Sequence, residues 1–250
     1  MLPMNKNSNQ DYRPTFYARY VSAFKGSEGT PAYSFSDTKL LPLLAPWVSD
    51  LPRNEACLDL GCGHGNILHA LQTLGFQNLQ GVDLSEEQVA IARRQFAHVE
   101  CMGLMEKLQR SAPASYQMIV LFDVIEHLTK REILDVFELV TSRLSPGGRV
   151  IVHCPNGDSP FVSTVRYGDF THETVLTPSS ARNLCNLFGL KDFDAKEHLA
   201  ASKSFRGFCR RLGWSVVRQL IRAVSAIETG SAGSGVFTRN FAFKAQKDRG

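Results

Sequence analysis

The sequence contains no apolar run that approaches the roughly 20 residues a membrane-spanning helix needs. Residues 1–14 lack the positively charged and then apolar order of a secretory signal peptide. Internal repeats and low-complexity segments are also missing. We therefore expect a cytoplasmic globular protein and neither an integral membrane protein nor a secreted one.

Paired cysteines are missing as well. The six cysteines include no C-x2-C pair, and the cysteines and histidines do not show the paired spacing of a zinc site. Several of them lie within apolar, strand-like runs, where a reduced cysteine behaves as a small hydrophobic residue. The pattern predicts a reducing compartment and no metal site.

The composition is that of a folded α/β protein, but its positive charge is unevenly spread. The chain has 250 residues, of which 43% are hydrophobic and 21% charged, and its formal net charge is +4. Six basic residues lie between Glu197 and Glu228 with no acid among them: Lys203, Arg206, Arg210, Arg211, Arg218 and Arg222. Because these six charges exceed the net charge, the rest of the chain is net negative. A single basic patch of this kind does not suit a DNA-coating surface, so we do not expect a nucleic-acid partner.

Short apolar runs alternate with helical patterns along most of the chain. This alternation predicts an α/β fold with a parallel sheet covered by helices on both faces. The expected strands are Ala56–Leu60, Leu79–Leu84, Val99–Met102, Gln117–Phe122, Arg149–Cys154, Lys191–Ala195 and Val236–Ala245. The expected helices are Gly65–Leu74, Glu86–Phe96, Lys130–Leu144, Pro178–Phe188 and Lys203–Ile227.

The same patterns predict how the chain is organised. Residues 1–50 are expected to form a helical lead-in, or cap, over a main domain at 51–250. Within that domain, 156–177 has the polar character of a loop-like insertion that would hold the substrate, and 203–227 is a basic amphipathic helix. The turn residues Ser145–Gly148 predict a stop before the fifth strand.

A glycine-rich turn between an apolar strand and a helix is the most informative stretch. Gly61, Gly63 and Gly65 follow the strand at 56–60, and bare backbone of this kind lets a ligand approach closely. About 20 residues on, Asp83 ends a second strand, where an acid can accept hydrogen bonds from both ribose hydroxyls of an adenosine cofactor. The third glycine of a dinucleotide fingerprint is missing, and Asp59 would repel a pyrophosphate. The pattern therefore favours S-adenosylmethionine over NAD.

Four segments resemble, in order, the motifs of class I S-adenosylmethionine-dependent methyltransferases: Leu58–Gly65, Gly81–Leu84, Phe122–Leu128 and Leu144–Val150. They cover about residues 55–155. The resemblance implies a Rossmann-like, seven-stranded, mostly parallel sheet. Its last strand would be inserted antiparallel between strands five and six.

The resemblance also implies roles for single residues. Gly61 and Gly63 would lie against the methionine part of S-adenosylmethionine, and Asp59 would help to orient that part. Asp83 would hold the ribose and Leu84 would pack beside the adenine. Phe122 would complete the cofactor site. Many relatives have an aspartate after strand three that binds the adenine amino group. The segment Cys101–Glu106 has no obvious equivalent, which favours backbone and apolar recognition of the adenine.

The insertion carries the information about the acceptor. Arg166–Thr174 and Leu176–Ser180 resemble a pattern found in bacterial methyltransferases of sugar and polysaccharide biosynthesis, and ubiquinone-type O-methyltransferases carry related histidine segments. The resemblance implies O-methylation of a sugar or a lipid-linked glycan precursor. The alternatives are a quinone-type or other small-molecule O-methyltransferase, and a catalytically inactive partner subunit that only binds the cofactor. The oligomeric state is left open.

Methyl transfer to a hydroxyl requires the acceptor to lose its proton, and a histidine near neutrality suits that task. His172, with Asp169 or Glu173 beside it, is the candidate general base. The alternative is a loop histidine that only hydrogen-bonds locally. His127 is the second catalytic candidate, and it would otherwise anchor its loop. His153 is expected to cap the end of its strand.

The expected helix at 203–227 is amphipathic. Its apolar residues recur at steps of three and four, and arginines occupy another face with Trp214 between them. Such a helix suits peripheral contact with an anionic membrane, which would place the protein at the inner face of that membrane. The alternatives are a helix packed on the domain with its arginines in solvent, or a clamp for a phosphate-bearing acceptor.

Overall fold

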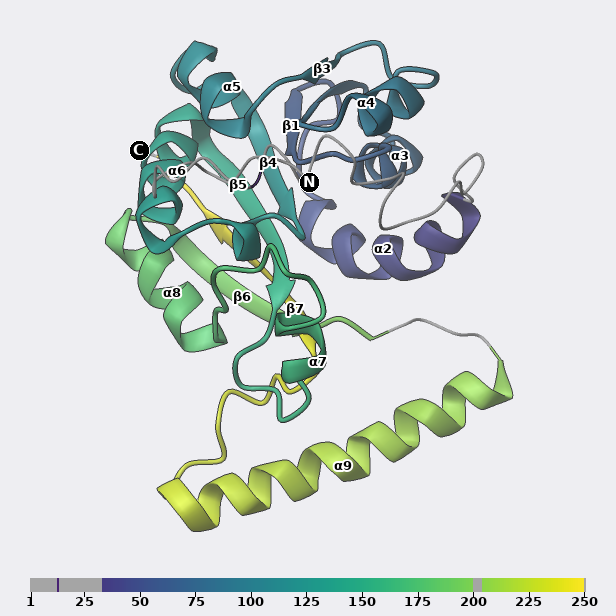
Figure 1. The fold of residues 1–250 in the computed structure, drawn as a ribbon, viewed down its shortest axis with the longest axis vertical. Coiled ribbons are helices and arrows are strands. Elements are labelled where there is room, and N and C mark those ends of the chain that lie inside the picture. The colour runs from purple at the N-terminus through teal and green to yellow at the C-terminus, as the bar shows by residue number, and fades with distance from the viewer. Residues whose placement is uncertain (1–12, 14–32, 200–203, 250) are drawn as a thin grey trace, which may run out of the picture.

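A computed structural model describes Arg13, residues 33–199 and residues 204–249 of the chain (Figure 1). Its centre is a seven-stranded sheet with the strand order β3-β2-β1-β4-β5-β7-β6. The first five strands pair in parallel, and β7 lies antiparallel between β5 and β6. The predicted fold class is confirmed. The strands are β1 Ala56–Leu60, β2 Asn78–Asp83, β3 Val99–Cys101, β4 Tyr116–Phe122, β5 Leu144–Pro155, β6 Lys191–Glu197 and β7 Asn240–Gln246.

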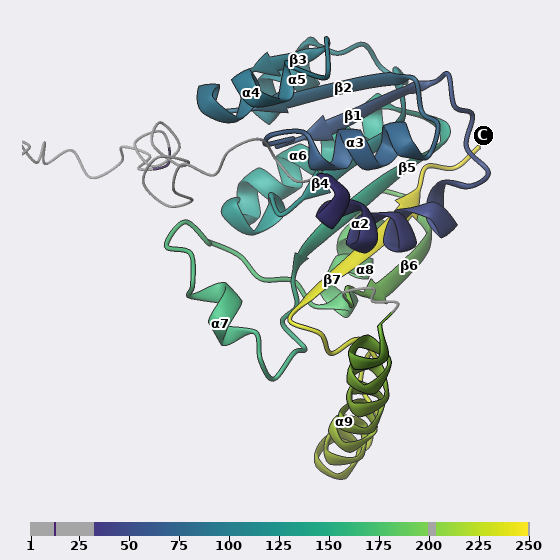
Figure 2. The same cartoon turned by 90° about the vertical axis from the view of Figure 1, so that its right-hand side faces the viewer.

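Helices cover both faces of the sheet (Figures 1 and 2). One face carries α2 Tyr33–Val48, α3 Asn66–Thr73 and α4 Glu86–Ala92. The other carries α5 Leu104–Arg110, α6 Lys130–Arg143 and α8 Pro178–Leu187. The remaining elements are the 3-10 turn η2 Ile125–His127, the short α7 Ser163–Arg166 and the long α9 Phe205–Thr229.

The hydrophobic core is divided by the sheet into two clusters. Successive side chains of a strand point to opposite faces, so the apolar run of β4 serves both clusters. Met118 and Val120 pack under α2 and α3, whereas Ile119 and Leu121 pack under α6. All four side chains are fully buried. A strand that is apolar at every position is therefore explained by helices on both of its faces.

The structure differs from the sequence prediction at several elements. α5 was not predicted, because Leu108 is its only buried residue and Gly103 caps it without a side-chain hydrogen bond. The insertion was expected to be loop-like, but it contains α7. The predicted stop at Ser145–Gly148 is wrong. β5 already begins at Leu144, and its pairing with β4 shifts register across these residues.

The end of the expected lead-in belongs to the main body. Trp47 and Val48 of α2 are buried, and the Trp47 indole Nε1 donates a hydrogen bond to Asp194 of β6 at 2.7 Å. Directly after α2, Asp50 forms a bidentate ion pair with Arg149 of β5. Apart from Arg13, residues 1–32 lie outside the described residues.

The basic helix expected over 203–227 is α9, which stands away from the sheet and its covering helices (Figures 1 and 2). Seven of its large hydrophobic side chains are exposed: Phe205, Phe208, Leu212, Val216, Leu220, Val224 and Ile227. Within the part of the chain that the structure describes, no helix, α9 included, is long and apolar enough to cross a membrane.

Candidate active site

A cavity of about 920 Å³ opens at the carboxyl ends of β1, β2 and β4. Ligands of open α/β sheets bind at this edge, where the loops after the strands converge. The glycine turn after β1, the end of β2, the loop after β4 and part of the insertion all contribute to its wall. Seven of the predicted site residues line it: Gly61, Gly63, Asp83, Leu84, Phe122, His127 and His172.

Contacts with β2 and with the loop after β4 fix the conformation of the glycine turn. The backbone N–H groups of Gly61 and Cys62 both donate to the carbonyl of Val82, at 2.8 and 2.9 Å. Gly61 has φ +78°, and a Cβ atom there would overlap Cγ2 of Val124. Glycine is therefore required at this position by the backbone conformation and by the loop after β4.

Asp83 connects the glycine turn to the helix that follows β2. One carboxylate oxygen accepts the backbone N–H of Gly63 at 2.9 Å, and the other accepts that of Ser85 at 2.8 Å. Asp83 itself lines the cavity beside Gly63 and Leu84, and a carboxylate is an acceptor that suits ligand hydroxyls. The geometry fits the predicted ribose contact.

An apolar wall continues from Asp83. Leu84 exposes 56% of its surface at the end of β2, and Met102, Leu104 and Met105 line the cavity beyond it. Gly103 lies beside Leu84, where an added Cβ atom would be 3.8 Å from its side chain. A flat heterocycle such as adenine would find apolar contact here, which agrees with the missing aspartate after strand three.

Asp59 lies beneath the turn and does not line the cavity. Its side chain is only 1% exposed, and neither carboxylate oxygen has a hydrogen-bond partner among the described residues. Burial first, and then the charge of Asp83, raise the pKa of Asp59 to about 8. A positively charged ligand group above the turn would stabilise the ionised form, so this uncompensated carboxyl fits S-adenosylmethionine.

A second polar group lies at the ends of β4 and β5. The carboxylate of Asp123 accepts a hydrogen bond from Nδ1 of His153 at 2.5 Å, and Nε2 of His153 is 2.7 Å from Nδ1 of His198. Phe122 stacks on the His153 ring at 4.1 Å. Burial would raise the pKa of Asp123, but the charge and hydrogen bond of His153 hold it below its usual range. His153 is thus the buried middle member of a hydrogen-bonded chain from the exposed Asp123 to His198, as well as the end of its strand.

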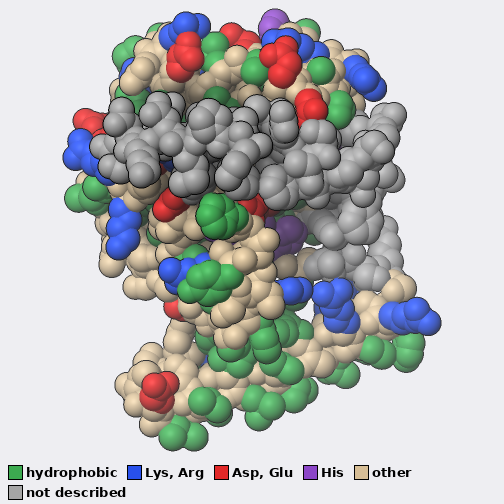
Figure 3. All heavy atoms as spheres, viewed as in Figure 1, with side chains coloured by type: hydrophobic (Ala, Val, Ile, Leu, Met, Phe, Trp, Pro, Cys, Tyr) green, Lys and Arg blue, Asp and Glu red, His purple; other side chains and the backbone are tan. Residues whose placement is uncertain are grey.

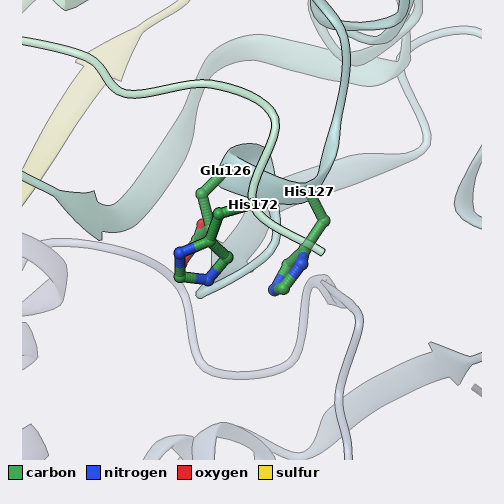
Figure 4. Close-up of side chains that lie close together, drawn as sticks. All are labelled: Glu126, His127 and His172. Carbon is green, nitrogen blue, oxygen red and sulfur yellow. The ribbon is translucent and has the colours of Figure 1, made fainter. Parts of the chain in front are cut away.

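The insertion brings His172 to the loop after β4 (Figure 4). The backbone N–H groups of Glu173 and Thr174 both donate to the carbonyl of Glu126, at 2.8 and 3.0 Å. This docking places the rings of His127 and His172 with their centroids 4.7 Å apart. Glu126 lies beside them, and its side chain is 3% exposed. The two catalytic candidates of the sequence are therefore neighbours in the fold.

The sequence predicted Asp169 or Glu173 beside His172, but hydrogen bonds connect Asp169 to His127 through Thr171. Asp169 accepts hydrogen bonds from the backbone N–H and the hydroxyl of Thr171, and that hydroxyl is 2.8 Å from Nδ1 of His127. Burial, and then the charge of His172, lower the pKa of His127. Burial, and then the charge of Asp123, raise the pKa of Glu126 well above its usual range.

Sequence reasoning missed the hydrogen-bonded chain Asp123–His153–His198 and the position of Glu126 beside His127 and His172. Asp123 and Glu126 stand in the motif Phe122–Leu128, so their neighbourhood was marked but their roles were not. His198 has no local signal, because only the antiparallel pairing of β6 with β7 carries it to the end of β5. Arg13 also lines the cavity, where it donates to the carbonyl of His127 and to Glu132.

The strand order and the cavity define a Rossmann-like domain of the class I methyltransferase type. A family model described as a methyltransferase domain matches residues 33–198, about two thirds of the chain. The chain therefore belongs to the methyltransferase domain family. Its fold is also that of solved S-adenosylmethionine-dependent methyltransferases, as the motifs predict.

Individual relatives are distant. YqeM of Bacillus subtilis is 29% identical over 41% of this chain, and the match spans only 43% of that protein. O-methyltransferase cnsE of Penicillium expansum is 26% identical over 70% of this chain and 68% of its own length. Among solved structures, an S-adenosylmethionine-dependent methyltransferase of Archaeoglobus fulgidus superposes with a TM-score of 0.65 at 18% identity, covering 93% of this chain and all of its own.

Proposed function

We propose that the protein transfers a methyl group from S-adenosylmethionine to an oxygen atom of a sugar or a lipid-linked glycan precursor. The observation that carries this proposal is the docking of the insertion, which sets His172 against His127 and Glu126 at the wall of the cofactor cavity. The similarity to O-methyltransferase cnsE supports oxygen as the acceptor atom.

Different residues of the cavity bind different parts of the cofactor. When bound, S-adenosylmethionine supplies a methyl group on a positively charged sulfur. Gly61 and Gly63 let its methionine part approach the backbone, and Asp59 orients that part from below. Asp83 holds the ribose, Leu84 packs on the adenine, and Phe122 closes the side of the site.

A residue of the insertion removes the proton from the acceptor. A hydroxyl group attacks the methyl carbon in line with the sulfur and must lose its proton as it does so. Nδ1 of His172 is buried and has no hydrogen-bond partner within the described part of the chain, so it is available to an acceptor hydroxyl. His127 supports it from the neighbouring position.

We infer that α9 lies on an anionic membrane surface. Trp214 donates a hydrogen bond to Glu197 at 3.0 Å, and Arg218 forms an ion pair with the same carboxylate, so this side of α9 faces the body. Val216 lies between them in sequence and about 200° around the helix from each, because an α-helix turns about 100° per residue. The exposed apolar residues therefore point away from the body, as the outer edge of α9 in Figure 3 shows.

Charge and position support a lipid-linked acceptor. Arg206, Arg210, Arg211 and Arg222 of α9 are exposed, and no acid interrupts them in the sequence. Arg210 and Arg211 line the cavity between α9 and the body beside Trp214, so it is the net positive charge of the whole helix that suits anionic head groups. The Phe161 ring lies 6.5 Å from Trp214 of α9, and Tyr167 and Phe170 nearby are exposed. A surface bound through α9 would thus lie near the segment that carries His172.

The activity is tested with the full chain, labelled S-adenosylmethionine and three acceptors: a soluble sugar, a polyprenyl-phosphate-linked sugar in anionic vesicles, and a quinol. We expect label in the two sugars, with the lipid-linked one preferred. His172→Ala should lower turnover about 10²–10⁴-fold with cofactor affinity retained. His98→Ala, an exposed histidine away from the cavity, is the matched control.

Other outcomes would replace this proposal. Methylation of the quinol alone would make the protein a quinone-type or small-molecule O-methyltransferase. Cofactor binding without methylation of any acceptor would favour an inactive partner subunit.

The membrane proposal is tested by sedimentation with anionic vesicles. Wild type should sediment at low salt, whereas a variant with Arg206, Arg210, Arg211 and Arg222 replaced by Gln should stay largely in solution, since each basic residue contributes about 1 kcal/mol. Salt should weaken the wild-type association. Replacing Leu212 and Val216 by Ser should reduce it, whereas Leu187→Ser, an equally exposed apolar residue on α8, should not. No sedimentation of wild type would leave α9 as a cover or an acceptor clamp.

A further inference from the structure

We propose that Glu126, His127 and His172 form a binding site for one divalent first-row metal ion, such as Mn²⁺, Co²⁺ or Zn²⁺. Two imidazoles and one carboxylate on the same side of an ion, with the other positions open, form a ligand set that such metals accept. The chain offers this set where η2 and the insertion meet, at the wall of the cavity (Figure 4).

The distances allow a shared ion. One ligand atom from each of the three residues can be chosen so that all lie within 4.8 Å of one another. Two ligands on the same side of an ion at 2.0–2.2 Å are separated by about 3–3.6 Å. Side-chain rotations that move these atoms by about 1–2 Å would therefore bring all three into the coordination sphere.

Two buried polar atoms of the cluster have no hydrogen-bond partner within the described part of the chain. The Glu126 side chain is 3% exposed, and its Oε2 atom has no hydrogen-bond partner among the residues described. Nδ1 of His172 is also buried, and the described chain offers it no partner. A buried polar atom without a partner is unfavourable, and a cation between these two atoms would satisfy both.

The third ligand is held in the correct tautomer by its neighbours. The Thr171 hydroxyl donates its proton to Asp169 at 2.6 Å, so it can only accept from Nδ1 of His127 at 2.8 Å. The ring proton of His127 is therefore on Nδ1, and the lone pair is on Nε2. A carboxylate that orients a metal-binding histidine through its other nitrogen is the usual outer support of a metal site. Here the Thr171 hydroxyl relays that support.

In the reaction, the ion would bind the acceptor hydroxyl at an open position and lower its pKa. The hydroxyl proton leaves to solvent, the oxygen forms a bond to the methyl carbon, and the carbon–sulfur bond breaks to give S-adenosylhomocysteine. His172 then acts on the acceptor as a ligand of the ion instead of taking the proton itself. This role in catalysis rests on the proposed function, whereas the metal site does not.

Metal binding is measured directly on the full chain after treatment with a chelator. Calorimetry with Mn²⁺ and Zn²⁺, and the visible absorption of Co²⁺, should show one site per chain. Glu126→Gln and His172→Gln should weaken binding at least about 100-fold, and Thr171→Val about 10- to 100-fold. His98→Ala should leave it unchanged. Absence of binding, or equal binding by wild type and Glu126→Gln, would overturn the proposal.

Activity separates this proposal from the proposed function. Methyl transfer should stop in chelator and return with added metal, while calorimetric binding of S-adenosylmethionine continues. Turnover that persists in chelator overturns the catalytic role of the ion. One bound ion per chain with no methylated acceptor leaves the metal site standing and removes the proposed function instead.

Discussion

Asp83 acts both on the fold and on the ligand. Its two carboxylate oxygens accept the backbone N–H groups of Gly63 and Ser85, and the residue lines the cavity. Asp83→Ala should therefore weaken S-adenosylmethionine binding about 10- to 100-fold, because hydrogen bonds to charged groups contribute roughly 1.5–3 kcal/mol. Asp83→Asn keeps one acceptor oxygen and should lose less. Calorimetry measures both, and equal affinity of folded Asp83→Ala and wild type would exclude the ribose role.

Asp59 should make stability depend on pH. Its pKa is about 8 in the folded protein and near 3.9 when unfolded, so the folded state binds more protons between these values. Stability from this group is present at acidic pH and is lost as the pH rises from about 4 through 8. Asp59→Asn removes the ionisation and should unfold at a temperature at least about 10 °C above wild type at pH 8, but not at pH 4.

The ligand gives Asp59 a second test. The same Asp59→Asn variant should bind S-adenosylmethionine about tenfold more weakly, because the positive ligand loses a buried countercharge. Thermal unfolding at pH 4, 6 and 8, with calorimetry at pH 8, gives both results. A wild-type curve that is flat between pH 4 and 8 would show that the carboxyl is compensated.

At the scale of elements, the Asp50–Arg149 pair connects the end of α2 to β5. The hydrogen bonds of Arg149 hold the pKa of Asp50 at about 2, against the effect of burial. A lowered pKa contributes stability above the unfolded value, and this contribution is lost as the pH falls from about 4 to 2. Asp50→Asn should cost about 1 kcal/mol at pH 7 and progressively less below pH 4, since Asp50 is half exposed. Urea unfolding across this range measures the difference, and a pH-independent difference would assign the effect to packing.

α9 lies in the connection between β6 and β7, two strands that pair with each other. Glu197 of β6 pairs with Phe241 of β7, so the chain leaves and re-enters the sheet at neighbouring points. Replacing residues 199–235 by a Gly/Ser linker of about ten residues should leave the unfolding temperature within about 3 °C, since a flexible loop of this length has a small closure cost. Vesicle binding should be lost. Loss of cooperative unfolding would show that α9 covers the core, contrary to its exposed apolar side.

For the whole molecule, the cofactor should stabilise the fold by mass action. At 100 times its dissociation constant, a ligand that binds only the folded state contributes about 2.7 kcal/mol. We expect S-adenosylmethionine to raise the unfolding temperature of wild type by several degrees and that of Asp83→Ala by much less at the same concentration. Thermal unfolding with and without ligand measures this. An equal rise in both would place the ligand away from Asp83.

Much of the fold followed from short-range signals. The alternation of apolar strands with helical patterns predicts the parallel sheet, and the resemblance of four motifs predicts β7 between β5 and β6. The sequence did not predict α5, because a helix with one buried residue shows little hydrophobic periodicity. The turn residues at 145–148 indicated a break, but β5 begins before them, where Leu144 pairs with Tyr116 of β4, and its pairing with β4 and β7 continues from Arg149.

By itself, the sequence determined the fold class, the glycine turn, Asp83 at the end of its strand and an amphipathic helix near the C-terminus, because each depends on residues close together in the chain. Only the tertiary structure decided the rest. Thr171 meets His127 across 44 residues, because the insertion docks its backbone on the carbonyl of Glu126. The same docking brings Glu126, His127 and His172 together, which spacing could not predict. The side of α9 that faces outward was also open until its contacts with Glu197 were known, because periodicity identifies an apolar face but not what lies against it.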